Sequence, residues 1–178
     1  YINPATGLIT FPEEILALAD VPRITISACG TAYYAGLVAK YWLERLARIP
    51  VEVDVASEFR YRESPMPKGG AALFVSQSGE TLDTLEALRY SKRQGQKIIS
   101  LLNTIESTME RESHHVIRTL AGPEIGVAST KAFTTQLTTL GCLSIALARK
   151  GEHITQAREQ NLTAAMRELP AAISALLN

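Results

Sequence analysis

Three side-chain hydroxyls lie within residues 76–81, whose sequence is Ser-Gln-Ser-Gly-Glu-Thr. This run follows an apolar stretch at 71–75 that is typical of a buried strand, and it precedes an amphipathic helical pattern. The first amides of a helix have no internal partner and the helix dipole makes that end electropositive, so hydroxyls there can converge on an anion. The run therefore predicts a phosphate site at Ser76, Ser78 and Thr81. The alternative is that Ser78 only caps the helix and that Ser76 and Thr81 are ordinary turn residues.

A second strand-to-helix turn has the same construction. Residues 23–28 have a strand-like pattern and lead through Cys29, Gly30 and Thr31 into another helical pattern. Two polar turns of this kind indicate a binding site rather than two isolated caps. Gly30 and Gly79 are the positions where a side chain would block close backbone approach, and the alternative is that both are plain turn glycines.

Composition limits the classes of function. The 178 residues are 46% hydrophobic, which predicts one compact domain, and 18 basic residues balance 18 acidic ones, so no overall field attracts nucleic acid or an anionic membrane. The sequence has only two cysteines, Cys29 and Cys142, which argues against a disulfide framework and indicates a reducing cytoplasm. The longest apolar stretch, 140–148, is too short to cross a bilayer, and no secretory signal precedes the fold. Because the chain starts at Tyr1 rather than at a methionine, we expect it to be a piece of a longer protein.

Strand-like and helix-like segments alternate along the chain, as in parallel β-α-β units. The predicted strands are residues 23–28, 51–55, 71–75, 97–102 and 116–120. Three of them lack polar alternation, as expected when helices cover both faces of a parallel sheet. Ligands of such sheets bind beyond the carboxyl ends of the strands, which is where both polar turns fall.

Apolar residues at three- and four-residue spacing predict the helices and their core-facing stripes. The first stripe comprises Tyr34, Leu37, Val38, Tyr41, Trp42 and Leu46, the second Leu82, Leu85 and Leu88. Residues 130–149 are apolar nearly all round, so this helix should be buried in the core or against a second copy or domain. Residues 155–177 carry another apolar stripe and form a connector that needs a packing partner, in which Pro170 starts a new helix or kinks the old one.

Four runs agree in order and spacing with one family. They are residues 29–31 (CGT), 56–62 (ASEFRYR), 76–81 (SQSGET) and 122–133 (GPEIGVASTKAF). These runs resemble the sugar isomerase (SIS) family and, more narrowly, the first of two SIS repeats in an enzyme that makes glucosamine 6-phosphate. The resemblance implies an α/β fold, a flavodoxin-like three-layer α/β/α sandwich around a five-stranded parallel sheet. It divides the chain into a linker with a short helix (1–20), the SIS domain (21–150) and a helical connector towards a second repeat (151–178).

The resemblance also implies a sugar-phosphate site at the two polar turns. The residues that hold the phosphate are Ser76, Gln77, Ser78 and Thr81, and those that line the sugar are Cys29, Gly30, Thr31, Val127 and Ser129. No organic cofactor or metal is implied. Relatives usually carry a serine where this chain has Ala32, and the missing donor should weaken phosphate binding by roughly 1 to 2 kcal/mol.

The implied partners are a small ligand and further parts of a parent chain. The ligand is fructose 6-phosphate or glucosamine 6-phosphate, and the chain joins a second SIS repeat and a glutaminase domain in a homodimer. The family draws its ring-opening and proton-transfer groups from the second repeat and the C-terminal tail. We therefore expect this chain to bind its ligand without turning it over.

Two other functions stay open. One is a stand-alone sugar-phosphate sensor, although such sensors are often joined to a helix-turn-helix, and this neutral chain has neither that motif nor a basic face. The other is a single-repeat aldose–ketose isomerase, for which Glu124 is the best local candidate for the base. The alternative for Glu124 is a structural role in shaping its loop.

Overall fold

Five parallel strands form the sheet of this chain in our computed structural model, which describes residues 1–126 and 129–177. The strands are β1 (Ile24–Ala28), β2 (Val51–Val55), β3 (Ala71–Ser76), β4 (Lys97–Leu102) and β5 (His115–Arg118). Their order across the sheet is β2-β1-β3-β4-β5. The chain therefore reverses its winding direction between β1 and β3, which makes this pair the topological switch point of the sheet.

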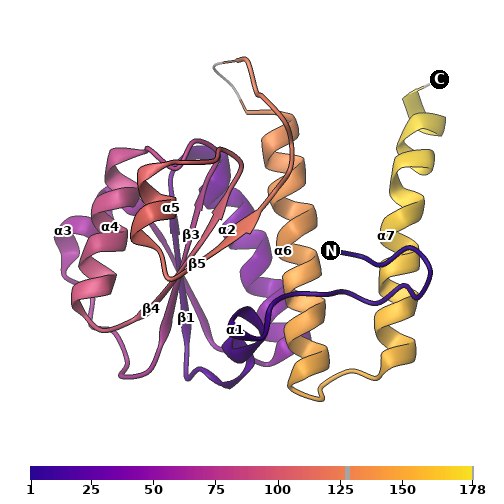
Figure 1. Cartoon of the computed structure of the whole chain (residues 1–178), viewed down its shortest axis with the longest axis horizontal. Coiled ribbons are helices and arrows are strands. Elements are labelled where there is room, and N and C mark those ends of the chain that lie inside the picture. The colour runs from indigo at the N-terminus through magenta and orange to yellow at the C-terminus, as the bar shows by residue number, and fades with distance from the viewer. Residues whose placement is uncertain (127–128, 178) are drawn as a thin grey trace.

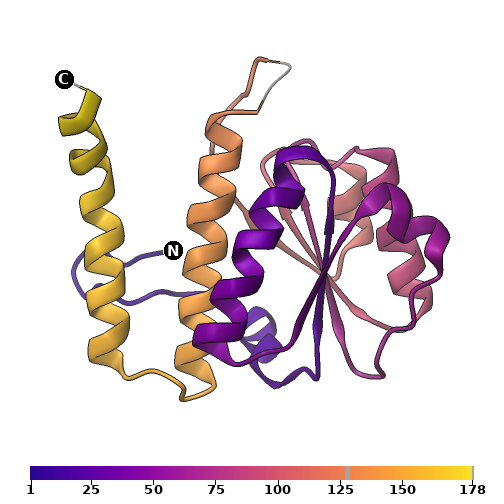
Figure 2. The same ribbon diagram turned by 180° about the vertical axis from the view of Figure 1, so that it is seen from behind.

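Helices cover both faces of the sheet, so the predicted three-layer α/β/α class is confirmed. One face packs against α1 (Glu13–Leu16), α2 (Gly30–Trp42) and α6 (Lys131–Lys150). The other packs against α3 (Ala56–Arg62), α4 (Leu82–Arg93) and α5 (Thr108–Glu112) (Figures 1 and 2). Both central strands are buried along their whole length, as a sheet covered on two sides requires.

The core face of α2 differs from the predicted one. Tyr34 and Tyr41 are 60% and 72% exposed, whereas the small residues of the helix are buried. These are Ala32, Ala35, Gly36 and Ala39. Small residues allow close approach: a Cβ added at Gly36 would lie 2.9 Å from Cγ2 of Ile26 on β1. The aromatic stripe was therefore the wrong choice, because helix-to-sheet distance rather than side-chain hydrophobicity selects the inner face.

One predicted core residue of α4 and the predicted end of one strand were also wrong. Leu82 at the start of α4 is exposed, although Leu85 and Leu88 are buried as predicted. The edge strand β5 ends at Arg118 rather than at residue 120, because Leu120 takes a left-handed conformation (φ 56°) that a strand does not tolerate. The π-helical turn η2 (Leu43–Ala47) extends α2, and the 3-10 turn η1 (Ala17–Asp20) follows α1.

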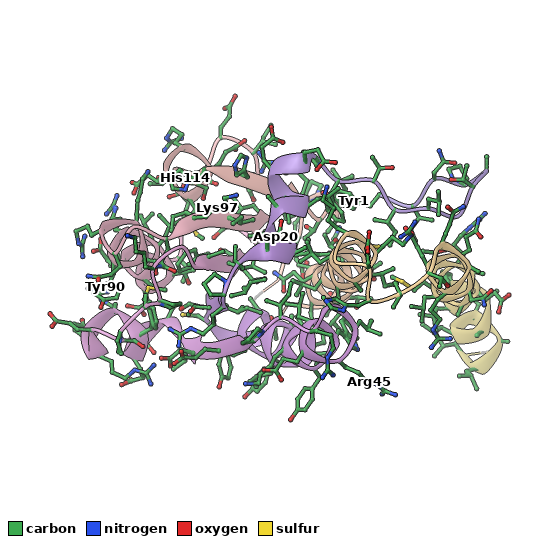
Figure 3. The ribbon with its side chains drawn as sticks, turned by 90° about the horizontal axis from the view of Figure 1, so that it is seen from below. Tyr1, Asp20, Arg45, Tyr90, Lys97 and His114 are labelled. Carbon is green, nitrogen blue, oxygen red and sulfur yellow. The ribbon has the colours of Figure 1, made fainter. Side chains whose placement is uncertain are left out.

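The last two helices form the side of the molecule remote from α3 and α4. Helix α6 is buried along most of its length, as predicted. Helix α7 (Gln156–Leu177) stands outermost, beyond α6 (Figure 3), and Pro170 lies inside it rather than starting a new helix. The N-terminal segment packs against α7: the Ile9 amide donates to Glu159 Oε1 (2.8 Å), and Thr163 Oγ1 donates to the Gly7 carbonyl (2.6 Å).

The outer half of α7 has an apolar face that no described residue buries. Its exposed side chains are Leu169, Ile173, Leu176 and Leu177. Within the part of the chain that the structure describes, no helix combines the length and the apolar character needed to cross a membrane. The apolar residues of α7 are thus a short exposed stripe at the end of an otherwise polar helix.

The small-residue face of α2 predicts a specific mutational response. Ala39→Leu should lower the free energy of unfolding by about 1–3 kcal/mol, because the added atoms must fit a fully buried position in a close-packed layer. Tyr41→Ala on the same helix should change it by less than about 0.5 kcal/mol, since that ring is mostly exposed. Urea unfolding measures both, and equal destabilisation would contradict the assignment of the inner face.

Candidate functional site

A cavity of about 450 Å³ opens at the carboxyl ends of β1 and β3. The register of the two strands pairs Ala28 with Val75, so the chain leaves both strands at the same level. The turns after them, β1-to-α2 and β3-to-α4, therefore form adjacent walls of the cavity. The loop before α6 and the second turn of α6 complete it.

Most of the predicted site residues line this one cavity. They are Ser76, Gln77, Ser78 and Thr81 from the phosphate group, Cys29, Gly30, Thr31 and Ser129 from the sugar group, and Glu124. Val127 lies outside the described residues. The structure thus brings together residues more than ninety positions apart in the sequence, from three separate loops.

The hydroxyls of the β3-to-α4 turn bind the backbone of their own loop. Ser76 Oγ accepts a hydrogen bond from the Gly79 amide (3.0 Å), and Ser78 Oγ accepts one from the Glu80 amide (3.2 Å). A hydroxyl that accepts such a bond still has its own proton to donate. These two serines can therefore shape the loop and donate to a ligand at the same time.

The helix that follows this turn begins without a side-chain cap. Helix α4 starts at Leu82, and the residue before it, Thr81, makes no capping hydrogen bond. Its hydroxyl lies 3.5 Å from that of Ser76. The alternative that Ser78 caps the helix is therefore wrong, because this residue lies outside the first turn of α4, whereas the turn role of Ser76 is confirmed.

The segment before α5, together with the start of α5, holds the β3-to-α4 turn in place. The Gln77 carbonyl accepts from the amides of Asn103 (3.2 Å) and Thr104 (3.1 Å), and the Gly79 carbonyl accepts from Met109 (3.1 Å). Backbone hydrogen bonds thus hold this loop to the neighbouring segment.

Glu80 adds a carboxylate anchor to the same contact. It accepts from the Thr108 amide (2.7 Å), and this bond lowers the pKa of the Glu80 carboxyl below its ordinary value. The carboxylate therefore holds the loop to the start of α5 as an ionised group.

Gly79 is the glycine that this loop requires. Its φ is +69°, and a Cβ added there would lie 2.6 Å from Cβ of Ser107 and closer still to its hydroxyl. Gly30 also has a positive φ (+56°), but an added Cβ there would meet no atom within 4 Å. Gly79 is thus needed for both conformation and close approach, and Gly30 for conformation alone.

The two polar turns are in direct contact. Cys29 is the residue before α2 and provides no side-chain cap for that helix. Its sulfur accepts a hydrogen bond from Thr84 Oγ1 (3.8 Å), which belongs to the first turn of α4. Thr84 is buried, so this contact fixes the spacing of the two helix N-termini at the cavity.

Glu124 caps the N-terminus of α6. One carboxylate oxygen accepts from the Thr130 amide and the other from the Ala132 amide, each at 2.7 Å. The bond from Thr130, supported by that from Ala132 and by the charge of Lys131, lowers the pKa of the Glu124 carboxyl. A carboxylate held in this way is a poor proton acceptor at neutral pH, and the geometry favours the structural role over the general base.

The cavity wall carries almost no charge. Glu124 is its one ionisable carboxylate, and no lysine, arginine or histidine lines it in the part of the chain that the structure describes. Nor do the described residues contain a group of three or more His, Cys, Asp or Glu placed to hold a metal ion. An anion here must be bound by hydroxyls, amides and helix N-termini.

Four lining residues were not singled out from the sequence, namely Val75, Thr84, Gly126 and Gln136, and Ala32, where the sequence predicts a missing donor, also lines the cavity. Ala32 is nearly buried, so a serine there would put its hydroxyl at the cavity wall. Gln136 is only 2% exposed, and its Oε1 has no hydrogen-bond partner among the described residues. A glutamine within a helix that is otherwise apolar nearly all round was the signal that could have identified it.

Comparison with known proteins gives one consistent family. A family model described as "SIS domain" matches residues 17–146. The glutamine–fructose-6-phosphate aminotransferase [isomerizing] of Gluconobacter oxydans is 60% identical over 168 residues, which are 94% of this chain and 28% of that protein. The enzyme of the same name from Zymomonas mobilis is 51% identical over 177 residues, 99% of this chain and 29% of its own length.

A solved structure agrees with these relatives. The C-terminal domain of glucosamine-fructose-6-phosphate aminotransferase from Francisella tularensis matches with a TM-score of 0.86 and 42% identity, over 89% of this chain and 45% of that one. The chain spans less than a third of the length of the two curated relatives described above.

The geometry at Gly79 predicts a coupled loss of stability and binding. An alanine in the left-handed conformation costs about 1–2 kcal/mol. Gly79→Ala should lower the free energy of unfolding by more than this, because Ser107 must also move. It should also abolish binding of a phosphate ligand to the cavity. Gly69→Ala is the matched control, since Gly69 has a similar φ (+75°) and open space around it. Urea unfolding and ligand titration test the pair, and normal binding by Gly79→Ala would contradict a preformed loop.

The Glu124 contact predicts a pH-dependent contribution to stability. Because folding lowers the pKa of this carboxyl from its ordinary 4.5, the contribution is complete above that value and is lost as the pH falls through the folded-state pKa. Glu124→Gln should therefore be less stable than wild type at pH 7, and the difference should shrink as the pH falls below 4.5. Urea midpoints measure it, with Glu168→Gln on the exposed face of α7 as control. A constant difference across this range would exclude the cap.

Proposed function

Because this chain belongs to the SIS domain family, we propose that it is the sugar-phosphate-binding half of the isomerase region of a glutamine–fructose-6-phosphate aminotransferase. The parent enzyme would convert fructose 6-phosphate and glutamine-derived ammonia into glucosamine 6-phosphate, in the cytoplasm. The observation that carries the proposal is the hydroxyl-lined cavity at the switch point between β1 and β3, whose described wall has no cationic side chain.

The chemistry of that cavity suits the phosphate of a sugar phosphate. Ser76, Ser78 and Thr81 present hydroxyl donors, and α4 begins beside them with its first amides uncapped by any side chain. A hydrogen bond to a charged group contributes about 1.5–3 kcal/mol, so several together can hold a dianion without a cation. The loop's bonds to the segment before α5 reduce the ordering needed on binding.

The same geometry supports binding without turnover. Aldose–ketose chemistry needs a base beside the sugar, and the lining carboxylate of Glu124 is already engaged by two backbone amides. No histidine lines the cavity among the described residues. The chain therefore depends on the rest of its parent protein for the groups that open the ring and move the proton.

The proposed partners follow from the parts of the relatives that this chain does not cover. We assign residues 1–20 to a linker with a short helix, 21–150 to the SIS domain and 151–178 to a connector. A second SIS repeat would cover the exposed apolar residues at the end of α7, and a glutaminase domain would supply ammonia. Homodimer formation completes the proposed assembly.

Calorimetric titration with fructose 6-phosphate tests the proposed ligand. Wild type should bind, and Thr81→Val should weaken binding by about 10- to 150-fold, the equivalent of one lost charge-assisted hydrogen bond. Thr138→Val, on the exposed side of α6, is the matched control and should bind as wild type does. Absence of binding by wild type would overturn the proposal.

Incubation in deuterated water separates binding from catalysis. The chain should leave the carbon-bound protons of fructose 6-phosphate unexchanged. Exchange at the second carbon of the product would contradict the binding-only role. If the Glu124→Gln variant then lost this exchange, Glu124 would be the base of a single-repeat isomerase. Proton NMR follows both.

A further inference from the structure

Gln136 has a buried side-chain oxygen that no described residue satisfies. Its side chain is 2% exposed, and its Oε1 has no hydrogen-bond partner among the described residues. Buried polar groups in proteins are nearly always paired, so such an atom needs an explanation. The residue lines the cavity at the switch point, together with Ser129 and Thr84.

Neighbouring polar residues on α6 behave differently. Thr135 Oγ1 donates to the Ala132 carbonyl (3.0 Å) and Thr138 Oγ1 to the Thr134 carbonyl (2.9 Å). Ser144, which is buried further along the helix, donates to the Leu140 carbonyl (2.8 Å). These hydroxyls are satisfied within their own helix, whereas the longer side chain of Gln136 is not.

The chemistry of an amide indicates which part of a ligand it contacts. A carboxamide offers an acceptor and a donor, and rotation by half a turn only exchanges their places. A phosphate dianion has acceptors alone and can satisfy the donor but not the acceptor. A sugar hydroxyl both donates and accepts, so adjacent hydroxyls of a hexose can satisfy the whole amide.

We propose that Gln136 binds the hydroxyls of the sugar and thereby sets the preference of the cavity for a hexose phosphate over a bare phosphate. The inference rests on the proposed function and adds a residue to the sugar end of the site. In this arrangement the β3-to-α4 turn holds the phosphate, and the second turn of α6 contacts the sugar. The unsatisfied amide of the ligand-free chain becomes paired on binding.

Gln136→Met tests this assignment, because it keeps the length of the side chain and removes the amide. Binding of fructose 6-phosphate should weaken about tenfold or more, whereas binding of inorganic phosphate should stay within about twofold of wild type. The ligand-free variant should be at least as stable as wild type in urea, since an apolar group replaces an unpaired polar one. A merely structural glutamine would show the opposite change in stability.

Gln96→Met is the matched control. Gln96 is also 2% exposed with an unpartnered Oε1, but it lies between α4 and β4, where its Nε2 donates to the Pro67 carbonyl (2.9 Å). Its replacement should lower stability and leave the ratio of the two affinities unchanged. Should Gln136→Met fail to fold, the side-chain amide signals of Gln136 in wild type provide the second test. They should shift with fructose 6-phosphate and not with inorganic phosphate.

The outcomes separate the inference from the proposed function. If wild type binds fructose 6-phosphate and Gln136→Met keeps the wild-type ratio of affinities, the inference is overturned and the proposed function stands. Amide signals that respond equally to both ligands would also overturn it. If wild type binds neither ligand, the proposed function itself fails.

Discussion

The parallel pairing of β1 with β3 is the constraint on which the rest of this molecule depends. Because Ala28 and Val75 are register partners, the next residues of both strands emerge side by side. A one-residue slip would turn every side chain of one strand to the opposite face of the sheet. Side chains that pack in one buried hydrophobic core would then point into the other. The packing of α2 and α6 on one face and of α4 on the other therefore fixes the register, and the register fixes the distance between the two polar turns.

The β3-to-α4 turn shows that forming a loop and binding an anion are compatible roles for one hydroxyl. Ser76 and Ser78 each accept a bond from a backbone amide two or three residues ahead, which leaves the hydroxyl proton for a ligand. Bonds from Asn103, Thr104 and Met109 to the carbonyls of the same turn are made at folding rather than at binding. The affinity of such a site comes from donors that are already in place.

How much the sequence could predict depended on whether the signal was local. The strands β2 and β4 and the two polar turns were predicted correctly, because apolar runs and serine- and glycine-rich turns are read from adjacent residues. The inner face of α2 was not, because Tyr34 and Tyr41 have the same periodicity as a core stripe and only the proximity of β1 selects Ala35 and Ala39 instead. The family resemblance identified most of the lining residues.

Gln136 was missed because its importance comes from an unpaired atom. A sequence pattern shows that a polar residue interrupts an apolar helix, but not whether the helix itself satisfies that residue. The same holds for the end of β5, which depends on the left-handed conformation of Leu120 rather than on the apolar character of the residue.

The helix N-termini around the cavity suggest which end of a ligand lies where. Glu124 already occupies the N-terminus of α6 with a carboxylate, so that end offers an anion no free amides at Thr130 and Ala132 and adds a like charge. The N-termini of α2 and α4 have no side-chain cap and lie beside the serine hydroxyls. In the proposed site, a sugar phosphate is therefore favoured with its phosphate towards α4, beside Ser76 and Ser78, and its neutral hydroxyls towards α6. Without a cation in the described wall, this asymmetry of helix ends is what can orient the ligand.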